Sequence, residues 1–170
     1  MAKKPYVIYA YPIWHTVSFS LIDKKHIEQL RKYTKVYEWD ELALPDIYPV
    51  KPYSLIVHPL FGATWRWLHM LRLAETSLDK LVAHLASRFE KYERAVAMDV
   101  ADSDRISDVA IKLTEVYDAV LVPSTFARRS YIDSGVKVRV EVLPHGLDLE
   151  WYDEPPIRAD SIGNLSLIHI

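Results

Sequence analysis

Three carboxylates lie within one short segment and are the first candidates for chemistry. Asp99, Asp102 and Asp104 stand at and just after the end of the apolar run 95–100. A carboxylate at a strand end can accept a proton or hydrogen-bond a sugar hydroxyl. An alternative needs no ligand: Ser103 or Asp104 caps the next helix, and Asp102 interacts with the positive end of its dipole. The two interpretations are compatible, because capping uses only one carboxylate.

The histidines and serines form no familiar catalytic motif. His15 lies in the loop after the first apolar run, where it could contact a phosphate or a hydroxyl; a solvated side chain is the alternative. His58 and His69 lack metal-ligand spacing, and no HExxH pair is present. Ser124 has no Gly-x-Ser-x-Gly frame around it. We therefore predict neither a zinc site nor a nucleophile elbow.

Composition excludes further classes of site. The chain has 4 glycines and none in its first loop, so it carries neither a phosphate-binding P-loop nor a dinucleotide fingerprint. It has no cysteine, which rules out disulfides, thiolate metal sites and thiol nucleophiles and is compatible with a reducing cytoplasm. The formal net charge of -2 argues against a nucleic-acid partner.

The elements that must position these residues alternate along the chain. Short apolar runs predict strands, and amphipathic patterns between them predict helices. Several runs are apolar without strict alternation, as in strands covered on both faces. We therefore predict an α/β fold with a doubly wound, mainly parallel sheet of about six strands. The predicted strands are 6–11, 35–39, 53–58, 95–100, 119–124 and 138–144.

Local signals mark some helix ends and connections. Thr76 and Asp79 resemble a capping box, Ser124 is placed to cap a helix, and Gly135 to close it in the left-handed conformation. The proline-rich segment 42–52 is predicted to be a loop. The segment 61–73 is rich in tryptophan and arginine, which suits sugar stacking or a membrane surface, although filling space under a connection is the favoured interpretation. No apolar run is long enough to span a bilayer.

The last third carries a specific resemblance. Residues 117–152 resemble the end of the N-terminal half of group 1, family 4-type glycosyltransferases, which have the GT-B fold. In these enzymes a strand ends in Pro-Ser, a short helix carries Phe and Arg, a Ser-Gly-Val turn follows, and the next strand runs into a Pro-His-Gly motif. The matching positions are Pro123, Ser124, Phe126, Arg128 or Arg129, Ser134 to Val136, and Pro144 to Asp148.

The resemblance implies a retaining transfer of sugar from a nucleotide-sugar donor to an acceptor hydroxyl of a glycan or a lipid-linked molecule. Of two Rossmann-like domains, the N-terminal one binds the acceptor, and no metal or other cofactor is required. It implies acceptor positioning by the catalytic candidates Asp99, Asp102 and Asp104. The expected cleft residues are His15, Ser18, Ser124, Phe126, Arg128, His145 and Gly146. Gly146 is expected to give the chain freedom to turn.

One departure from the family pattern concerns the first loop. Many relatives carry a glycine-rich loop there, whereas this chain has Pro-Ile-Trp-His-Thr-Val-Ser. Two alternatives follow: side chains such as His15 or Ser18 replace the backbone contact to the donor, or this contact is absent. We expect a Rossmann-like domain over 1–148 and the start of an interdomain linker over 149–164. Residues 165–170 read like a translated sequencing adapter, which predicts a non-native tail on a truncated, inactive half.

Two alternatives remain open at this point. One is a free-standing flavodoxin- or receiver-like binding module, which is not an enzyme. The other is half of a GT-B nucleotide-sugar epimerase, which shares the two-domain plan. In each case the absence of an evident targeting signal predicts a cytoplasmic location, and any membrane contact would be peripheral.

Overall fold

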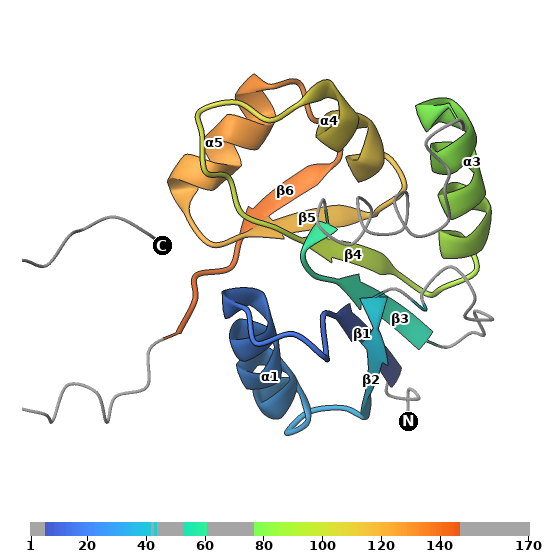
Figure 1. The fold of residues 1–170 in the computed structure, drawn as a ribbon, viewed down its shortest axis with the longest axis vertical. Helices are drawn as coiled ribbons and strands as arrows, with labels where there is room; N and C mark the ends of the chain where they lie inside the picture. The colour runs from blue at the N-terminus through green and yellow to red at the C-terminus, as the bar shows by residue number, and fades with distance from the viewer. Residues whose placement is uncertain (1–5, 42, 44–52, 61–76, 147–170) are drawn as a thin grey trace, which may run out of the picture.

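A six-stranded, wholly parallel sheet forms the centre of the molecule (Figure 1). The computed structural model describes residues 6–41, 43, 53–60 and 77–146. The six predicted strands are all confirmed, with ends that shift by up to two residues. They are β1 (Tyr6–Tyr11), β2 (Val36–Asp40), β3 (Tyr53–Val57), β4 (Ala95–Met98), β5 (Ala119–Val122) and β6 (Arg139–Val142). The segment 61–73 lies outside the described residues, as does 42–52 apart from Ala43.

The strand order is β2-β1-β3-β4-β5-β6, so the direction of winding reverses between β1 and β3. Helix α1 (Ser18–Leu30) lies on one side of the sheet, whereas α3 (Leu78–Phe89), α4 (Asp108–Thr114) and α5 (Thr125–Asp133) lie on the other (Figure 1). This is a Rossmann-like, doubly wound fold, as predicted. In such folds ligands bind beyond the carboxyl ends of the strands where the winding reverses.

The two sides of the sheet bury different cores. On the side of α3 to α5, aliphatic and aromatic side chains form the larger cluster, with Leu55, Val57, Leu85 and Val120 at its centre. On the side of α1, the smaller cluster consists of Val7, Tyr9, Tyr11, Ile27, Val36 and Met98. The side of α1 therefore buries two tyrosines, and their hydroxyl groups need polar partners there.

Serine side chains cap three of the helices. The Oγ atom of Ser124 accepts a hydrogen bond from Ala127 N at 3.1 Å, and Gly135 has a φ of 98°, so both predicted ends of α5 are confirmed. The N-cap of α3 is Ser77 rather than Thr76. The N-cap of α4 is Ser107, so the prediction that Ser103 or Asp104 caps this helix was wrong. None of the described helices is long and apolar enough to cross a membrane.

Candidate functional site

A buried polar network joins α1 to β1 and β3 at the point where the winding reverses. Asp23, on the buried face of α1, is fully buried, and its Oδ1 atom accepts a hydrogen bond of 2.8 Å from the Tyr9 hydroxyl. The same oxygen lies 2.5 Å from Nδ1 of His58, which directly follows β3. His26, one helical turn after Asp23, places its Nδ1 atom 3.2 Å from the Tyr9 hydroxyl. Four side chains from three elements therefore form one connected network.

The α1 helix can supply these groups because its buried face is partly polar. The buried residues of α1 are Ser20, Asp23 and Ile27. The Ser20 hydroxyl donates a 2.6 Å hydrogen bond to the carbonyl of Pro12 and so ties the first turn of the helix to the loop after β1. The following turn of the helix places the Asp23 carboxylate beside the Tyr9 hydroxyl. Burying a carboxylate is costly unless hydrogen bonds compensate it, and Tyr9 and His58 supply two such bonds.

The hydrogen-bond pattern determines where the protons lie. The Tyr9 hydroxyl has one proton, and the Asp23 carboxylate at 2.8 Å is a stronger acceptor than Met98 Sδ at 3.3 Å, so we assign the proton to Asp23 and the Tyr9 oxygen accepts from His26. His26 must then carry a proton on Nδ1, and its Nε2 atom, when the ring is neutral, holds a lone pair. His58 likewise donates through Nδ1 to Asp23. One carboxylate thus orients two imidazoles, one directly and one through a tyrosine.

The pKa values in this network follow from burial and from the Asp23 charge. Burial raises the pKa of Tyr9, and the nearby Asp23 raises it further, so the phenol stays protonated. Burial lowers the pKa of His26, with His58 and His145 acting in the same direction and Asp23 opposing them. The second carboxylate oxygen of Asp23, Oδ2, is buried without a hydrogen-bond partner among the described residues.

The turn after β6 reaches this network although β6 lies at the far edge of the sheet. The ring of His145 is 5.9 Å from the ring of His26, centroid to centroid. Leu143, Pro144, His145 and Gly146 are exposed. Partial desolvation of its ring lowers the pKa of His145; His58 contributes in the same direction, and Asp23 opposes them. Of the predicted cleft residues, His145 is the one that contacts the network.

Gly146 does not need the freedom that glycine provides. Its φ does not lie in the left-handed region, and a Cβ atom built on it would meet nothing within 4 Å. The expectation that Gly146 allows a special turn is therefore not met by its backbone conformation. Leu147 and Asp148, the rest of the motif, lie outside the described residues.

The three predicted catalytic carboxylates occupy two different environments. Asp99 is buried directly after β4, where its Oδ1 atom accepts a hydrogen bond of 2.9 Å from Val100 N. Burial raises the pKa of Tyr131 and of Tyr117, and the nearby Asp99 charge raises both pKa values further. Asp102 and Asp104 are exposed in the turn before α4. Asp99 thus belongs to the packing under α5, and acceptor positioning by these three residues stays a prediction.

The other predicted cleft residues lie in the loop after β1, at the start of α1, and at or within α5. His15 is exposed in the loop after β1, and Ser18 is exposed at the first residue of α1. Ser124 caps α5, whereas the Phe126 side chain is 55% exposed. Arg128 donates from Nε to the carbonyl of Val140 at 3.0 Å, which anchors α5 to β6. Their proposed contacts with a ligand stay predictions.

Sequence reasoning missed Tyr9, Asp23 and His26 and dismissed His58 for lacking metal spacing. The strand-end rule points to His58, because it follows β3 directly and β3 lies beside β1. Asp23 and His26 are three residues apart and so share one face of a helix. Among the residues that the structure describes, no group of three or more His, Asp or Glu side chains could hold a metal ion.

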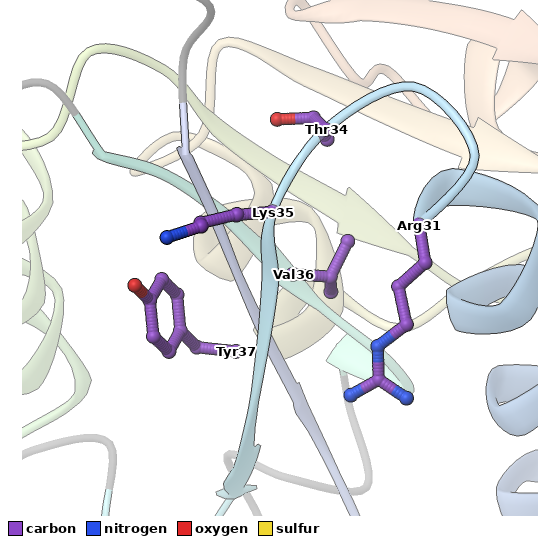
Figure 2. A pocket seen from close by; sticks show the side chains of 5 residues that line it. All are labelled: Arg31, Thr34, Lys35, Val36 and Tyr37. Atoms are coloured by element: carbon purple, nitrogen blue, oxygen red, sulfur yellow. The ribbon is translucent and has the colours of Figure 1, made fainter.

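A surface depression of about 360 Å³ lies beside the start of β2, which is an outer strand of the sheet. It is lined by Arg31, Thr34, Lys35, Val36 and Tyr37. Figure 2 shows the Arg31 and Lys35 side chains pointing to opposite sides of the strand. Arg31 also forms an ion pair of 2.6 Å with Glu38. The two cations therefore do not converge on one anion, and this depression is a weaker candidate than the buried network.

Comparisons with known proteins find a similarity to a viral protein. No family model matches the chain, and no solved structure matches it. A curated protein of Sulfolobus islandicus rod-shaped virus 1, "Uncharacterized protein 356", is 29% identical over 137 residues. The match covers 78% of this chain and 35% of the viral protein, so the chain spans about a third of that relative's length.

Proposed function

We propose that this chain is the acceptor-binding half of a retaining glycosyltransferase. The observation that carries the proposal is the position of the Pro144–Gly146 turn. This turn follows β6 and is exposed to solvent. It brings the ring of His145 to 5.9 Å from the ring of His26, centroid to centroid. A connection to a second domain is expected to be exposed, and a ligand site is expected where the winding reverses. In this chain the exposed turn after β6 lies beside the network at the reversal of winding.

The local structure around the glycosyltransferase-like motif supports the proposal. Ser124 caps α5, Gly135 ends it with a φ of 98°, and β6 then runs parallel to β5 toward Pro144. The length of the viral relative is also compatible, because most of that protein lies outside the matched segment and leaves room for a donor-binding domain.

The proposed reaction divides the chemistry between two halves. The half represented by this chain holds the acceptor, a glycan or a lipid-linked hydroxyl, beside the network at the edge of the sheet. The donor half binds the nucleotide sugar and stabilises the departing diphosphate with helix N-termini and basic side chains. Holding both substrates together is the main contribution to rate, so this half alone is inactive. We also propose a cytoplasmic location, with peripheral membrane contact where the acceptor is lipid-linked.

The test compares the full-length viral relative with the 170-residue chain. Each protein is incubated with radiolabelled UDP-glucose, GDP-mannose or dTDP-glucose and with oligosaccharide or polyprenyl phosphate acceptors. We expect label to appear in an acceptor with the longer protein only, with retained anomeric configuration. Conversion of the donor sugar without transfer would favour an epimerase. Equal transfer by the short chain, or none by the longer protein, would contradict the proposal.

A second candidate is a free-standing flavodoxin- or receiver-like binding module. The observation that favours it is the strand order β2-β1-β3-β4-β5, which is the order of flavodoxin-like folds. Flavodoxin-type cofactors bind at the same reversal of winding. Titration of the chain with FMN tests the flavodoxin-like form of this module: saturable quenching of flavin fluorescence at micromolar concentration supports it, and the absence of quenching excludes it.

A further inference from the structure

We propose that His26 is the proton acceptor of this site, and that its Nε2 atom takes the proton of the acceptor hydroxyl during sugar transfer. Tyr9 and Asp23 act as positioning residues for this imidazole. This inference rests on the proposed function and deepens it, because it assigns a role to a residue that neither the motif nor the resemblance indicated.

The first argument is the orientation of the His26 ring. Its Nδ1 atom donates to the Tyr9 oxygen, which in turn donates to Asp23 Oδ1. The Nε2 atom makes no hydrogen bond to any described residue, so the lone pair of the neutral ring is unused. A general base is commonly held in one tautomer by a hydrogen bond to its other nitrogen, with a carboxylate behind it. Here a tyrosine stands between the carboxylate and the base.

The second argument compares His26 with the other described histidines. His58 is oriented by Asp23 but is 1% exposed, so it cannot reach a substrate. His15, His84 and His145 are exposed, and none of their rings makes a hydrogen bond to a described residue that would fix its tautomer. Among the histidines in the described part of the chain, His26 alone combines partial exposure with a fixed orientation.

The third argument is electrostatic. Protonation of His26 creates a positive charge on a half-buried ring, and Asp23 attracts this charge through Tyr9. The groups that face His26 from the neighbouring elements are Asp23, His58 and His145; the two histidines disfavour its protonation, as burial does. The ring therefore stays neutral near pH 7 and has a counter-charge available when it accepts a proton.

The proposed step balances without a further reactant. The O–H bond of the acceptor breaks, and its proton moves to Nε2 of His26. The freed oxygen electron pair forms the bond to the anomeric carbon of the donor sugar on the face from which the diphosphate departs, so that the anomeric configuration is retained. The bond between that carbon and the diphosphate oxygen breaks, and its electron pair leaves with the nucleoside diphosphate. Loss of such a base commonly lowers a rate by about 10²–10⁴-fold.

The test on the 170-residue chain is the tautomer of each histidine, read from two-bond nitrogen–proton NMR correlations near pH 7.5. We expect His26 to carry its proton on Nδ1, and we expect Tyr9→Phe to shift the His26 tautomer toward that measured for the exposed His84 in the same sample. Tyr117→Phe is the matched control, because it removes a buried hydroxyl that has no hydrogen-bond partner among the described residues. It should leave the His26 signals unchanged.

Reaction with diethyl pyrocarbonate, followed by mass spectrometry, tests access to the lone pair in the same samples. We expect His26 to be modified on Nε2 and His58 to be protected. A proton on Nε2 of His26, insensitivity to Tyr9→Phe, or protection of His26 equal to that of His58 would each overturn the inference.

The role in transfer is tested with this domain joined to the remainder of the viral relative. His26→Gln should lower kcat by about 10²–10⁴-fold with KM little changed. Tyr9→Phe should displace the pH profile of kcat/KM, which loss of packing alone would not do. Activity of His26→Gln within twofold of the parent would refute the assignment. Absence of transfer by the intact viral relative would instead refute the proposed function, and the base role with it, whatever the tautomer.

Discussion

The Tyr9 hydroxyl gives the sharpest test of the buried network. Tyr9→Phe removes one oxygen atom and keeps the ring, which is fully buried and packs edge-on to Tyr11 with centroids 6.0 Å apart. The hydrogen bond to Asp23 Oδ1 is lost. His26 is half-buried, so its Nδ1–H group can turn to water, and Asp23 retains the hydrogen bond from His58. The change therefore removes one hydrogen bond to a carboxylate, together with the weaker contacts of the hydroxyl to His26 Nδ1 at 3.2 Å and Met98 Sδ at 3.3 Å.

The expected loss follows from the type of bond. A hydrogen bond to a charged group contributes about 1.5–3 kcal/mol to stability. We therefore expect Tyr9→Phe to lower the free energy of unfolding by about 1.5–3 kcal/mol. For a chain of this size each kcal/mol lowers Tm by about 2–4 °C, so the expected decrease in Tm is roughly 3–12 °C.

The control is Tyr117→Phe, which makes the same chemical change in a fully buried ring on the other side of the sheet. The Tyr117 hydroxyl has no hydrogen-bond partner among the described residues, so its removal relieves a desolvation cost. We expect unchanged or slightly higher stability. Urea unfolding followed by circular dichroism measures both variants. If Tyr9→Phe costs no more than Tyr117→Phe, the network does not form as described.

Three further predictions concern pH and helix ends. The folded-state pKa values of His26 and His145 lie below the ordinary value of 6.5, so the unfolded chain binds protons first as the pH falls. The free energy of unfolding should therefore decrease between pH 6.5 and the lowered pKa values. Urea titrations at several pH values measure this slope, and His26→Gln should flatten it. Ser124→Ala removes the cap of α5 and should cost about 0.5–2 kcal/mol in the same assay, whereas no loss would show that the cap is dispensable. Gly135→Ala forces a side chain into a φ of 98° and should cost about 1–2 kcal/mol, whereas Gly146→Ala should be neutral; equal effects would contradict the assigned conformations.

The fold was predictable because its signals are local. Each strand is a short apolar run, and the serine and glycine at the two ends of α5 determine its limits through their own backbone preferences. The start of α1 has no such apolar signal, because the buried face of its first turns carries Ser20 and Asp23. A search for apolar periodicity cannot detect a helix face that is buried through polar contacts.

The candidate site was predicted less well, for a reason of the same kind. Strand-end reasoning selected Asp99, Asp102 and Asp104 because they are close together in the sequence, yet the structure buries the first and exposes the other two. Proximity along a chain says little about convergence in space, since neighbouring residues in a turn point in different directions.

The sequence by itself determined the class of fold, the number and direction of the strands, and the ends of α5, because these depend on residue spacing and backbone preference. Only the tertiary structure decided which polar groups meet. Tyr9 lies 14 residues from Asp23, and Asp23 lies 35 residues from His58. These residues come together because β3 pairs with β1 and α1 packs across both, and strand order and register are properties of the whole sheet that no single segment encodes.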